Sequence, residues 1–253
     1  SFNQTTYEAC KAFAEDNGVE FSYFKPAGDN TADRVAMIEK AADEGYNVIV
    51  MPGYAFGGAI VEAAPEFPDV KFIALDVAKG DLLETAVANA GESYDYNPDN
   101  WELDKYVNMS NVYCAVYQEE LCGYMAGYAA VKLGYKNLGF LGGMAVPAVV
   151  RYGYGFVQGV DAAAADLGLT DVSLNYVYGG QFFGDADITA VMDTWYAGGT
   201  EVVFACGGGI YTSAVDAAKK VGAKVIGVDV DQAGVIAGYA GVEGMTVTSA
   251  MKG

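Results

Sequence analysis

The side chains best suited to chemistry in this chain are acids that close short apolar runs. Asp76 follows the run 70–75, and Asp229 follows the run 224–228. Such runs predict buried parallel strands, and open α/β sheets place their ligand crevice at the carboxyl ends of these strands. We therefore expect Asp76 and Asp229 to face a cleft. The alternative is that Asp229 and Asp231 are solvated loop acids and a helix N-cap.

Aromatic rings occupy other predicted loops. Phe182 and Phe183 precede a predicted helix at 186–196, and Phe2 stands near the start of the sequence. Rings stack on a flat heterocycle, and ionised acids accept hydrogen bonds from ring N–H or sugar O–H groups. These residue types indicate a site for a flat heterocycle with a hydroxylated tail. Taken alone, Phe182 or Phe183 fits a core position better.

The glycine-rich segments do not match a nucleotide-binding motif. Gly207, Gly208 and Gly209 precede a predicted helix, and their N–H groups could hold an anion. However, the sequence has no G-x-x-x-x-G-K-[ST] motif, and the pair Gly153 and Gly155 lies in a helix-like segment without G-x-G-x-x-G spacing. Close packing of the backbone against a ligand or a helix is the favoured use of these glycines.

The usual components of an active site are missing. The sequence contains no His, which removes the commonest general base and the commonest transition-metal ligand. No G-x-S-x-G motif occurs, and a serine nucleophile has no histidine to activate it. The adjacent acids Glu119 and Glu120 fit a solvated face better than a catalytic pair. We expect no catalytic residue, no metal and no cofactor.

Composition narrows the class of partner. The 253 residues are 53% apolar and 19% charged, which predicts a folded globular chain, and the net charge is −19. Such a field repels nucleic acids, so we expect none as a partner, whereas a neutral or cationic solute is compatible. The cysteines form no C-x-x-C pair and are interpreted as small buried apolar residues: Cys10, Cys114, Cys122 and Cys206.

Strand-like and helix-like segments alternate along the chain, which predicts two α/β lobes. The expected strands are 19–24, 47–51, 70–75, 111–117, 137–141, 172–178, 202–205, 224–228 and a segment after 245. The polar, aromatic and turn-rich segment 90–107 is interpreted as a surface insertion. We expect one lobe at 1–118 with 243–253, and the second at 119–242.

Several motifs occur in the order of a known family. They are Ser1-Phe2-Asn3-Gln4, 68–76, 120–127, 139–144 with Pro147, Gly155-Phe156, 227–232, and Thr248-Ser249 with Lys252. With these motifs the chain resembles, over nearly its whole length, the basic membrane protein family of substrate-binding lipoproteins, which includes the purine nucleoside receptor of spirochaetes. The resemblance implies a type I periplasmic-binding-protein fold, two α/β lobes around a hinged cleft.

The resemblance also implies roles for individual residues. Phe2 and Phe183 would sandwich a purine base, since Phe183-Gly184-Asp185 fits the family's Phe-x-Asp. Asp76 would accept hydrogen bonds from the base edge, and Asp229 with Lys252 would hold the ribose hydroxyls. Asn3, Gly53 and Gly207 would form the neighbouring wall.

The partners that the resemblance implies are a nucleoside and the membrane permease of an ABC importer. We expect a monomer that works outside the cytoplasm, and both ends of the chain to be truncated, with the lipid-bearing segment absent. The insertion around Trp101, the long segment 233–244 and the lack of an acid at 143–146 depart from the family, so base preference is left open. The alternatives are another solute such as riboflavin or a sugar, an effector-sensing regulatory domain, and an enzyme acting on a nucleoside or sugar.

Overall fold

The computed structural model describes residues 2–252, which divide into two compact units. We call residues 2–116 the amino-terminal unit and residues 117–252 the carboxy-terminal unit. Ser1, the first residue of the first family motif, lies outside the described residues. No helix within residues 2–252 combines the length and the apolar character needed to cross a membrane.

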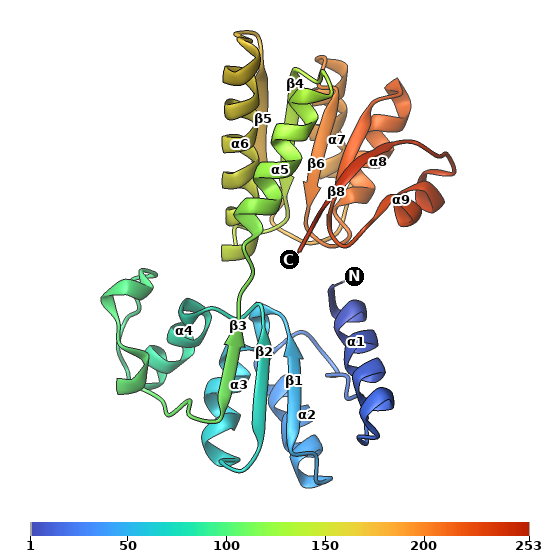
Figure 1. The fold of residues 1–253 in the computed structure, drawn as a ribbon. Coiled ribbons are helices and arrows are strands. Elements are labelled where there is room, and N and C mark those ends of the chain that lie inside the picture. The colour runs from blue at the N-terminus through green and yellow to red at the C-terminus, as the bar shows by residue number, and fades with distance from the viewer. Residues whose placement is uncertain (1, 253) are drawn as a thin grey trace. The chain divides into compact units, whose positions relative to one another are not determined.

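The amino-terminal unit is built on a parallel sheet of order β1-β2-β3. Register pairs Pro52 with Leu75 and Leu75 with Ala115, so the carboxyl ends of the three strands are level. Phe72, Met51 and Ile60 lie in its core. The elements, shown in Figure 1, are α1 (Phe2–Asn17), α2 (Thr31–Asp43), β1 (Val48–Pro52), α3 (Gly57–Ala63), β2 (Lys71–Leu75), α4 (Lys79–Asn89) and β3 (Val112–Ala115).

The predicted insertion at 90–107 folds on itself with two short 3₁₀ helices, Pro98–Asn100 and Leu103–Lys105. Asp95 accepts hydrogen bonds from Trp101 Nε1 and Asn100 Nδ2, each at 2.6 Å, and these bonds lower the pKa of its carboxyl. Leu103 packs against the unit's core. The segment is therefore an ordered covering of this unit rather than a loose loop.

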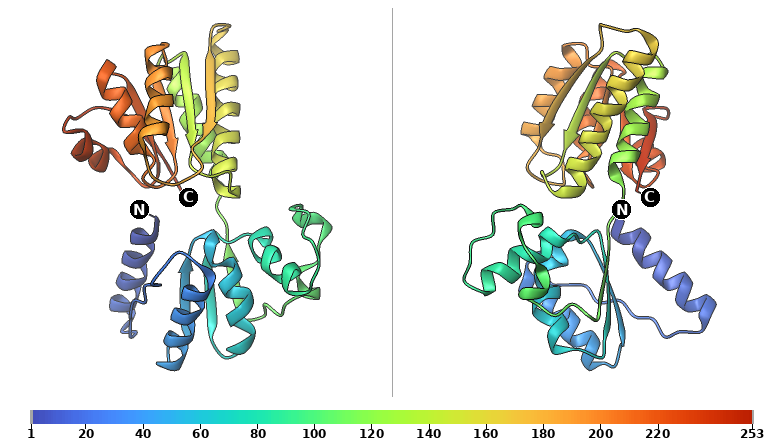
Figure 2. Two further views of the ribbon diagram at one scale, coloured as in Figure 1. Left: turned by 180° about the vertical axis from the view of Figure 1, so that it is seen from behind. Right: turned by 60° about the vertical axis from the view of Figure 1, so that its left-hand side comes forward.

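The carboxy-terminal unit has a parallel sheet of order β5-β4-β6-β7-β8, with helices on both faces (Figures 1 and 2). Helices α5 and α6 share one core cluster with the sheet, and α7, α8 and α9 share the other. The strands are β4 (Asn137–Gly142), β5 (Ser173–Tyr178), β6 (Val202–Cys206), β7 (Lys224–Asp229) and β8 (Thr246–Met251); the helices are α5 (Glu119–Lys132), α6 (Pro147–Leu167), α7 (Ala186–Ala197), α8 (Tyr211–Val221) and α9 (Ala233–Ala240).

Local sequence explains these elements. All five residues of β6 are buried, as the apolar run predicts for a central strand covered on both faces. Asp185 caps α7 by accepting the N–H of Ile188, and left-handed Gly168 and Gly222 end α6 and α8. Gly123 on α5 lets α6 approach so closely that a Cβ there would lie 2.1 Å from the Tyr152 carbonyl oxygen.

Some expectations differ from the structure. Strand β8 pairs in parallel with β7, so the described part of 243–253 belongs to the carboxy-terminal unit and not to the first lobe, because β7 offers it a hydrogen-bonding edge. Segment 19–24 forms no strand, although it alternates, since it pairs with no strand in the described part of the chain. Residues 2–4 begin a helix rather than a loop.

The cysteine interpretation holds only in part. Cys122 and Cys206 are buried, as expected, and burial raises the pKa of the Cys206 thiol. Cys114 is exposed and Cys10 is half-buried, because β3 lies at the edge of its sheet and α1 buries only Ala14 fully.

Candidate functional site

Each unit places an acid at the carboxyl end of a parallel strand, in a backbone conformation that is uncommon for any residue except Gly. Asp229 ends β7 with φ 67°, and Asp76 follows β2 with φ 61°. A non-glycine residue in this left-handed region is strained by about 1–3 kcal/mol and persists only where the surroundings hold it. Backbone hydrogen bonds hold both: Asp76 donates its N–H to Ala115 O at 2.7 Å, and the carbonyl of Asp229 accepts the N–H of Lys252 at 2.8 Å.

The Asp229 carboxylate is 22% exposed and contacts two side chains of its own unit. Tyr152 Oη donates a hydrogen bond to Oδ1 at 3.2 Å, and Lys252 Nζ lies 3.9 Å from the same oxygen. Burial raises the pKa of Asp229, while the positive charge of Lys252 and the hydrogen bond from Tyr152 oppose that rise. The structure therefore brings together Asp229 and Lys252, which the family pattern pairs. The solvated-loop alternative fits only Asp231, whose carboxylate accepts the N–H of Ala233 at the start of α9.

Lys252 is enclosed by the first residues of the carboxy-terminal unit. Its side chain is 6% exposed, its Nζ lies 5.3 Å from the centre of the Tyr117 ring, and Glu119 Oε1 is 3.4 Å away. Glu119 is fully buried, and its second oxygen accepts Arg151 Nε at 2.7 Å. The cluster therefore contains two acids, Glu119 and Asp229, and two cations, Lys252 and Arg151.

Sequence reasoning missed most of this cluster. It assigned Glu119 to a solvated face, and this is wrong, since none of the Glu119 side chain is exposed. Arg151 and Tyr152 went unnoticed because α6 carries them far along the chain from Asp229. The available signal was the position of Glu119, an acid that opens a helix rich in small residues directly after a predicted strand.

The two adjacent phenylalanines have different surroundings. Phe182 packs against the core, and a Cβ on Gly143 would lie 2.5 Å from its ring. Phe183 is 62% exposed and forms an isolated parallel bridge with Gly209, whose N–H donates to the Phe182 carbonyl at 2.8 Å. Of the pair, Phe183 is thus the ring that solvent or a ligand can reach. Gly207 is buried beside Phe182, which agrees with close packing of the glycine loop.

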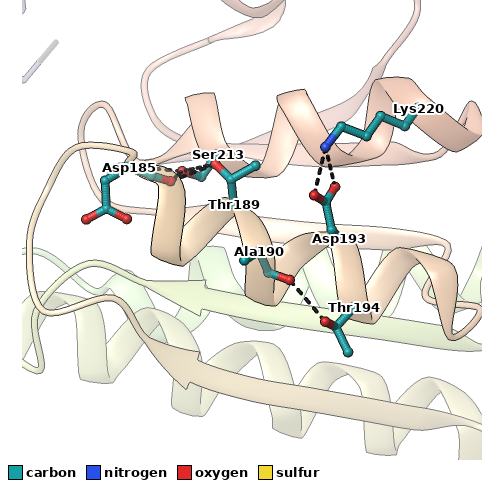
Figure 3. A network of polar contacts seen from close by, with 7 residues as sticks. All are labelled: Asp185, Thr189, Ala190, Asp193, Thr194, Ser213 and Lys220. Atoms are coloured by element: carbon teal, nitrogen blue, oxygen red, sulfur yellow. Dashed lines mark hydrogen bonds and ion pairs between the residues drawn. The ribbon is translucent and has the colours of Figure 1, made fainter.

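A polar network fixes the loop that carries Phe183 (Figure 3). Ser213 Oγ on α8 accepts the N–H of Asp185 at 3.0 Å and the hydroxyl of Thr189 at 2.9 Å. At the far end of the two helices, Lys220 and Asp193 form an ion pair at 2.7 Å. A groove of about 410 Å³ lies between α7 and α8. Its lining residues Asp185, Thr189 and Ser213 bond to one another, and Asp193 bonds to Lys220. We therefore regard the network as the support of the Phe183 loop.

The amino-terminal unit brings Gly53 and Asp76 together. They follow the neighbouring strands β1 and β2, and the Gly53 N–H donates to the carbonyl of Leu75 at 2.7 Å. Nearby, burial raises the pKa of the Tyr54 hydroxyl, and the charges of Asp29, Asp81 and Asp76 raise it further, while the charge of Arg34 lowers it. This end of the sheet is therefore acidic and suits a ligand that donates hydrogen bonds.

The other predicted residues of this unit, Phe2 and Asn3, lie in the first turn of α1, where Phe2 is half-buried and Asn3 is exposed. The carbonyl of Phe2 accepts the Thr6 hydroxyl at 3.0 Å. Among residues 2–252, no group of three His, Cys, Asp or Glu side chains is arranged to hold a metal ion.

Comparison with known proteins identifies the family. Residues 1–253 match the family model described as ABC transporter substrate-binding protein PnrA-like. The ABC transporter nucleoside-binding protein BmpA of Lactococcus lactis subsp. cremoris (strain MG1363) is 25% identical over 245 residues, which are 92% of this chain and 60% of that protein. The chain thus spans about three fifths of this curated relative.

Solved structures support the fold. A solute-binding protein of an ABC transporter system from Aeropyrum pernix K1 matches with a TM-score of 0.66 at 21% identity, over 91% of this chain and 58% of that one. A periplasmic binding protein/LacI transcriptional regulator from Alkaliphilus metalliredigens QYMF matches with a TM-score of 0.57 at 12% identity, over 98% of this chain and 89% of that one. The expected α/β fold of the type I periplasmic-binding-protein class is confirmed. The matched family consists of substrate-binding proteins, which are not enzymes, in agreement with the expectation of no catalytic residue.

Proposed function

Because the chain belongs to the family of PnrA-like ABC transporter substrate-binding proteins, we propose that it binds a purine nucleoside of the guanosine, inosine or adenosine type. The carboxy-terminal unit supplies Phe183, Gly207, Asp229 and Lys252, and the amino-terminal unit supplies Phe2, Asn3, Gly53 and Asp76. The observation that carries the proposal is Asp229, a strained, partly exposed acid held beside Lys252 at the carboxyl end of β7.

The chemistry of these groups suits a nucleoside. Phe183 presents an exposed ring for stacking, which contributes about 1–3 kcal/mol per base in nucleic-acid binding. Asp229 and Asp76 are acceptors for hydroxyl and ring N–H donors, and each charge-assisted hydrogen bond contributes about 1.5–3 kcal/mol. Together these contributions can offset the ordering cost of binding and still give roughly micromolar affinity. A relative named as a nucleoside-binding protein supports this choice of ligand.

Isothermal titration with guanosine, inosine and adenosine tests the proposal. We expect at least one to bind with a Kd below about 100 μM, and Asp229→Ala to weaken it by about 1.5–3 kcal/mol without loss of fold. If none of the three binds, the nucleoside proposal is wrong. Riboflavin and simple sugars, titrated in parallel, distinguish another solute on the same fold.

We also propose the setting in which the whole protein works. It is a monomer outside the cytoplasm, anchored by a lipid on an N-terminal segment outside this sequence, and it delivers its ligand to the membrane permease of an ABC importer. Membership of a family of ABC transporter substrate-binding proteins supports this setting. Pull-down of the permease from the membrane fraction by the full-length protein, with and without nucleoside, tests the proposed partner. Light scattering tests the proposed monomeric state.

A further inference from the structure

A buried acid, Glu119, contacts two cations, Arg151 and Lys252, and Lys252 also lies beside Asp229. Glu119 is the first residue of α5, none of its side chain is exposed, and its two oxygens face different partners. Oε2 accepts Arg151 Nε from α6 at 2.7 Å, and Oε1 lies 3.4 Å from Lys252 Nζ, just beyond the end of β8. A carboxylate taken out of water is stable only when it is paired, so these two contacts must compensate its burial.

The geometry around Lys252 is set by the beginning of the carboxy-terminal unit. Tyr117 and Glu119, two residues apart, contact the ammonium group with a ring at 5.3 Å and a carboxylate at 3.4 Å. Asp229 Oδ1 is 3.9 Å from the same ammonium group, which is too long for a hydrogen bond. Glu119 is thus the nearer of the two acids to Lys252, yet Asp229 is the acid with an exposed surface.

We propose that Glu119 is a positioning residue that holds Lys252 beside Asp229, and so sets the affinity for the hydroxylated part of the ligand. This inference rests on the proposed nucleoside function. Glu119 has no exposed surface and cannot touch a ligand itself, so its effect must pass through Lys252 and Arg151. Loss of its charge would leave Arg151 without this acid and release Lys252 from its place.

The neighbouring Glu120 is a matched control. It lies in the same first turn of α5, and its Oε2 is also buried, but no cation contacts it among the ion pairs of residues 2–252. The same change of charge at Glu120 therefore alters the same turn of the helix but leaves the contacts of Glu119 with Arg151 and Lys252 in place.

The test compares inosine with 2′,3′-dideoxyinosine by isothermal titration, in wild type, Glu119→Gln, Glu120→Gln and Lys252→Met. We expect Glu119→Gln to weaken the binding of inosine about tenfold and that of the dideoxy analogue little, so that the protein no longer distinguishes the two ligands. Glu120→Gln should keep the difference in affinity. The double variant Glu119→Gln/Lys252→Met should bind no more weakly than Lys252→Met alone. Equal weakening of both ligands, or additive losses, would overturn the proposal.

A measurement without ligand separates this inference from the nucleoside proposal. Acetylation of Lys252 by acetic anhydride, followed by peptide mass spectrometry, should be several-fold faster in Glu119→Gln than in wild type and Glu120→Gln. Equal rates would overturn the positioning role whatever the ligand proves to be, and failure of wild type to bind inosine would count only against the nucleoside. If Glu119→Gln does not fold, Glu119→Gln/Arg151→Gln removes one acid with one cation and is tested in the same way.

Discussion

The closest helix contact in the carboxy-terminal unit predicts a large effect from a single methyl group. A Cβ on Gly155 of α6 would lie 1.9 Å from the Glu120 carbonyl oxygen of α5, and real Cβ atoms essentially never approach below 3.0 Å. The obstacle is backbone, so it cannot rotate away. In Gly155→Ala the two helices must therefore separate by roughly 1 Å at this point, which is overpacking of a dense interior.

The magnitude follows from that displacement. Overpacking typically costs about 1–3 kcal/mol, and occasionally more. For a chain of this size, each kcal/mol lowers the melting temperature by roughly 2–4 °C. The shift also affects the site, because Glu120 adjoins Glu119, and Arg151 lies one helical turn before Gly155 on α6. We expect Gly155→Ala to weaken ligand binding as well as stability.

Gly238→Ala is the matched control. Gly238 lies inside α9, and a Cβ there would meet no atom within 4 Å. Since Ala is favoured over Gly in a helix by about 0.5–1 kcal/mol, this variant should unfold at the same or a higher temperature. Thermal unfolding by circular dichroism measures both. If the melting temperature of Gly155→Ala equalled or exceeded that of wild type, the close contact between α5 and α6 would be wrong.

The remaining predictions concern the acids and rings. Burial raises the pKa of Asp229 above its unfolded value of about 3.9, so its contribution to stability is present below that value and is lost as pH rises through the folded pKa. The free energy of unfolding of Asp229→Asn, relative to wild type, should therefore increase as the pH rises from about 4 to about 7 in urea unfolding. A difference between the two proteins that does not change with pH would contradict this. Phe183→Ala should lose about 1–3 kcal/mol of nucleoside binding in titrations and little stability, because the ring is exposed. Phe182→Ala should lower the free energy of unfolding. Because the ring is only partly buried against the core, the loss should stay below the roughly 3–5 kcal/mol of a fully buried Phe. Asp76→Asn should change the ranking of guanosine, inosine and adenosine rather than abolish binding, and an unchanged ranking would exclude Asp76 from base recognition.

The fold was predictable because its signals are local. The buried run of β7 and the following acid were visible in the sequence, and so was the alternation of strands with helices. The partner of β8 was not visible, since pairing depends on which sheet edge is open. Segment 19–24 shows the same limit, because a strand pattern forms a strand only when another strand lies beside it.

The place of a candidate residue was predictable where the residue stands at the end of its own strand, as Asp229 and Asp76 do. Glu119, Arg151 and Tyr152 were missed because they act through contacts among α5, α6 and β7, and no spacing along the chain encodes these contacts. The difference between Phe182 and Phe183 is also tertiary, since Gly143 and Gly207 leave room for one ring and the loop turns the other outward.

Asp76 and Asp229 share a property that composition cannot reveal. Each stands at the carboxyl end of a parallel strand with its backbone in the left-handed region. Asp tolerates this conformation better than most residues because its short polar side chain can hydrogen-bond locally. Glycine would relieve the strain but would remove the carboxylate. An acid in this strained conformation at both positions is the structural reason to test the two carboxylates for function.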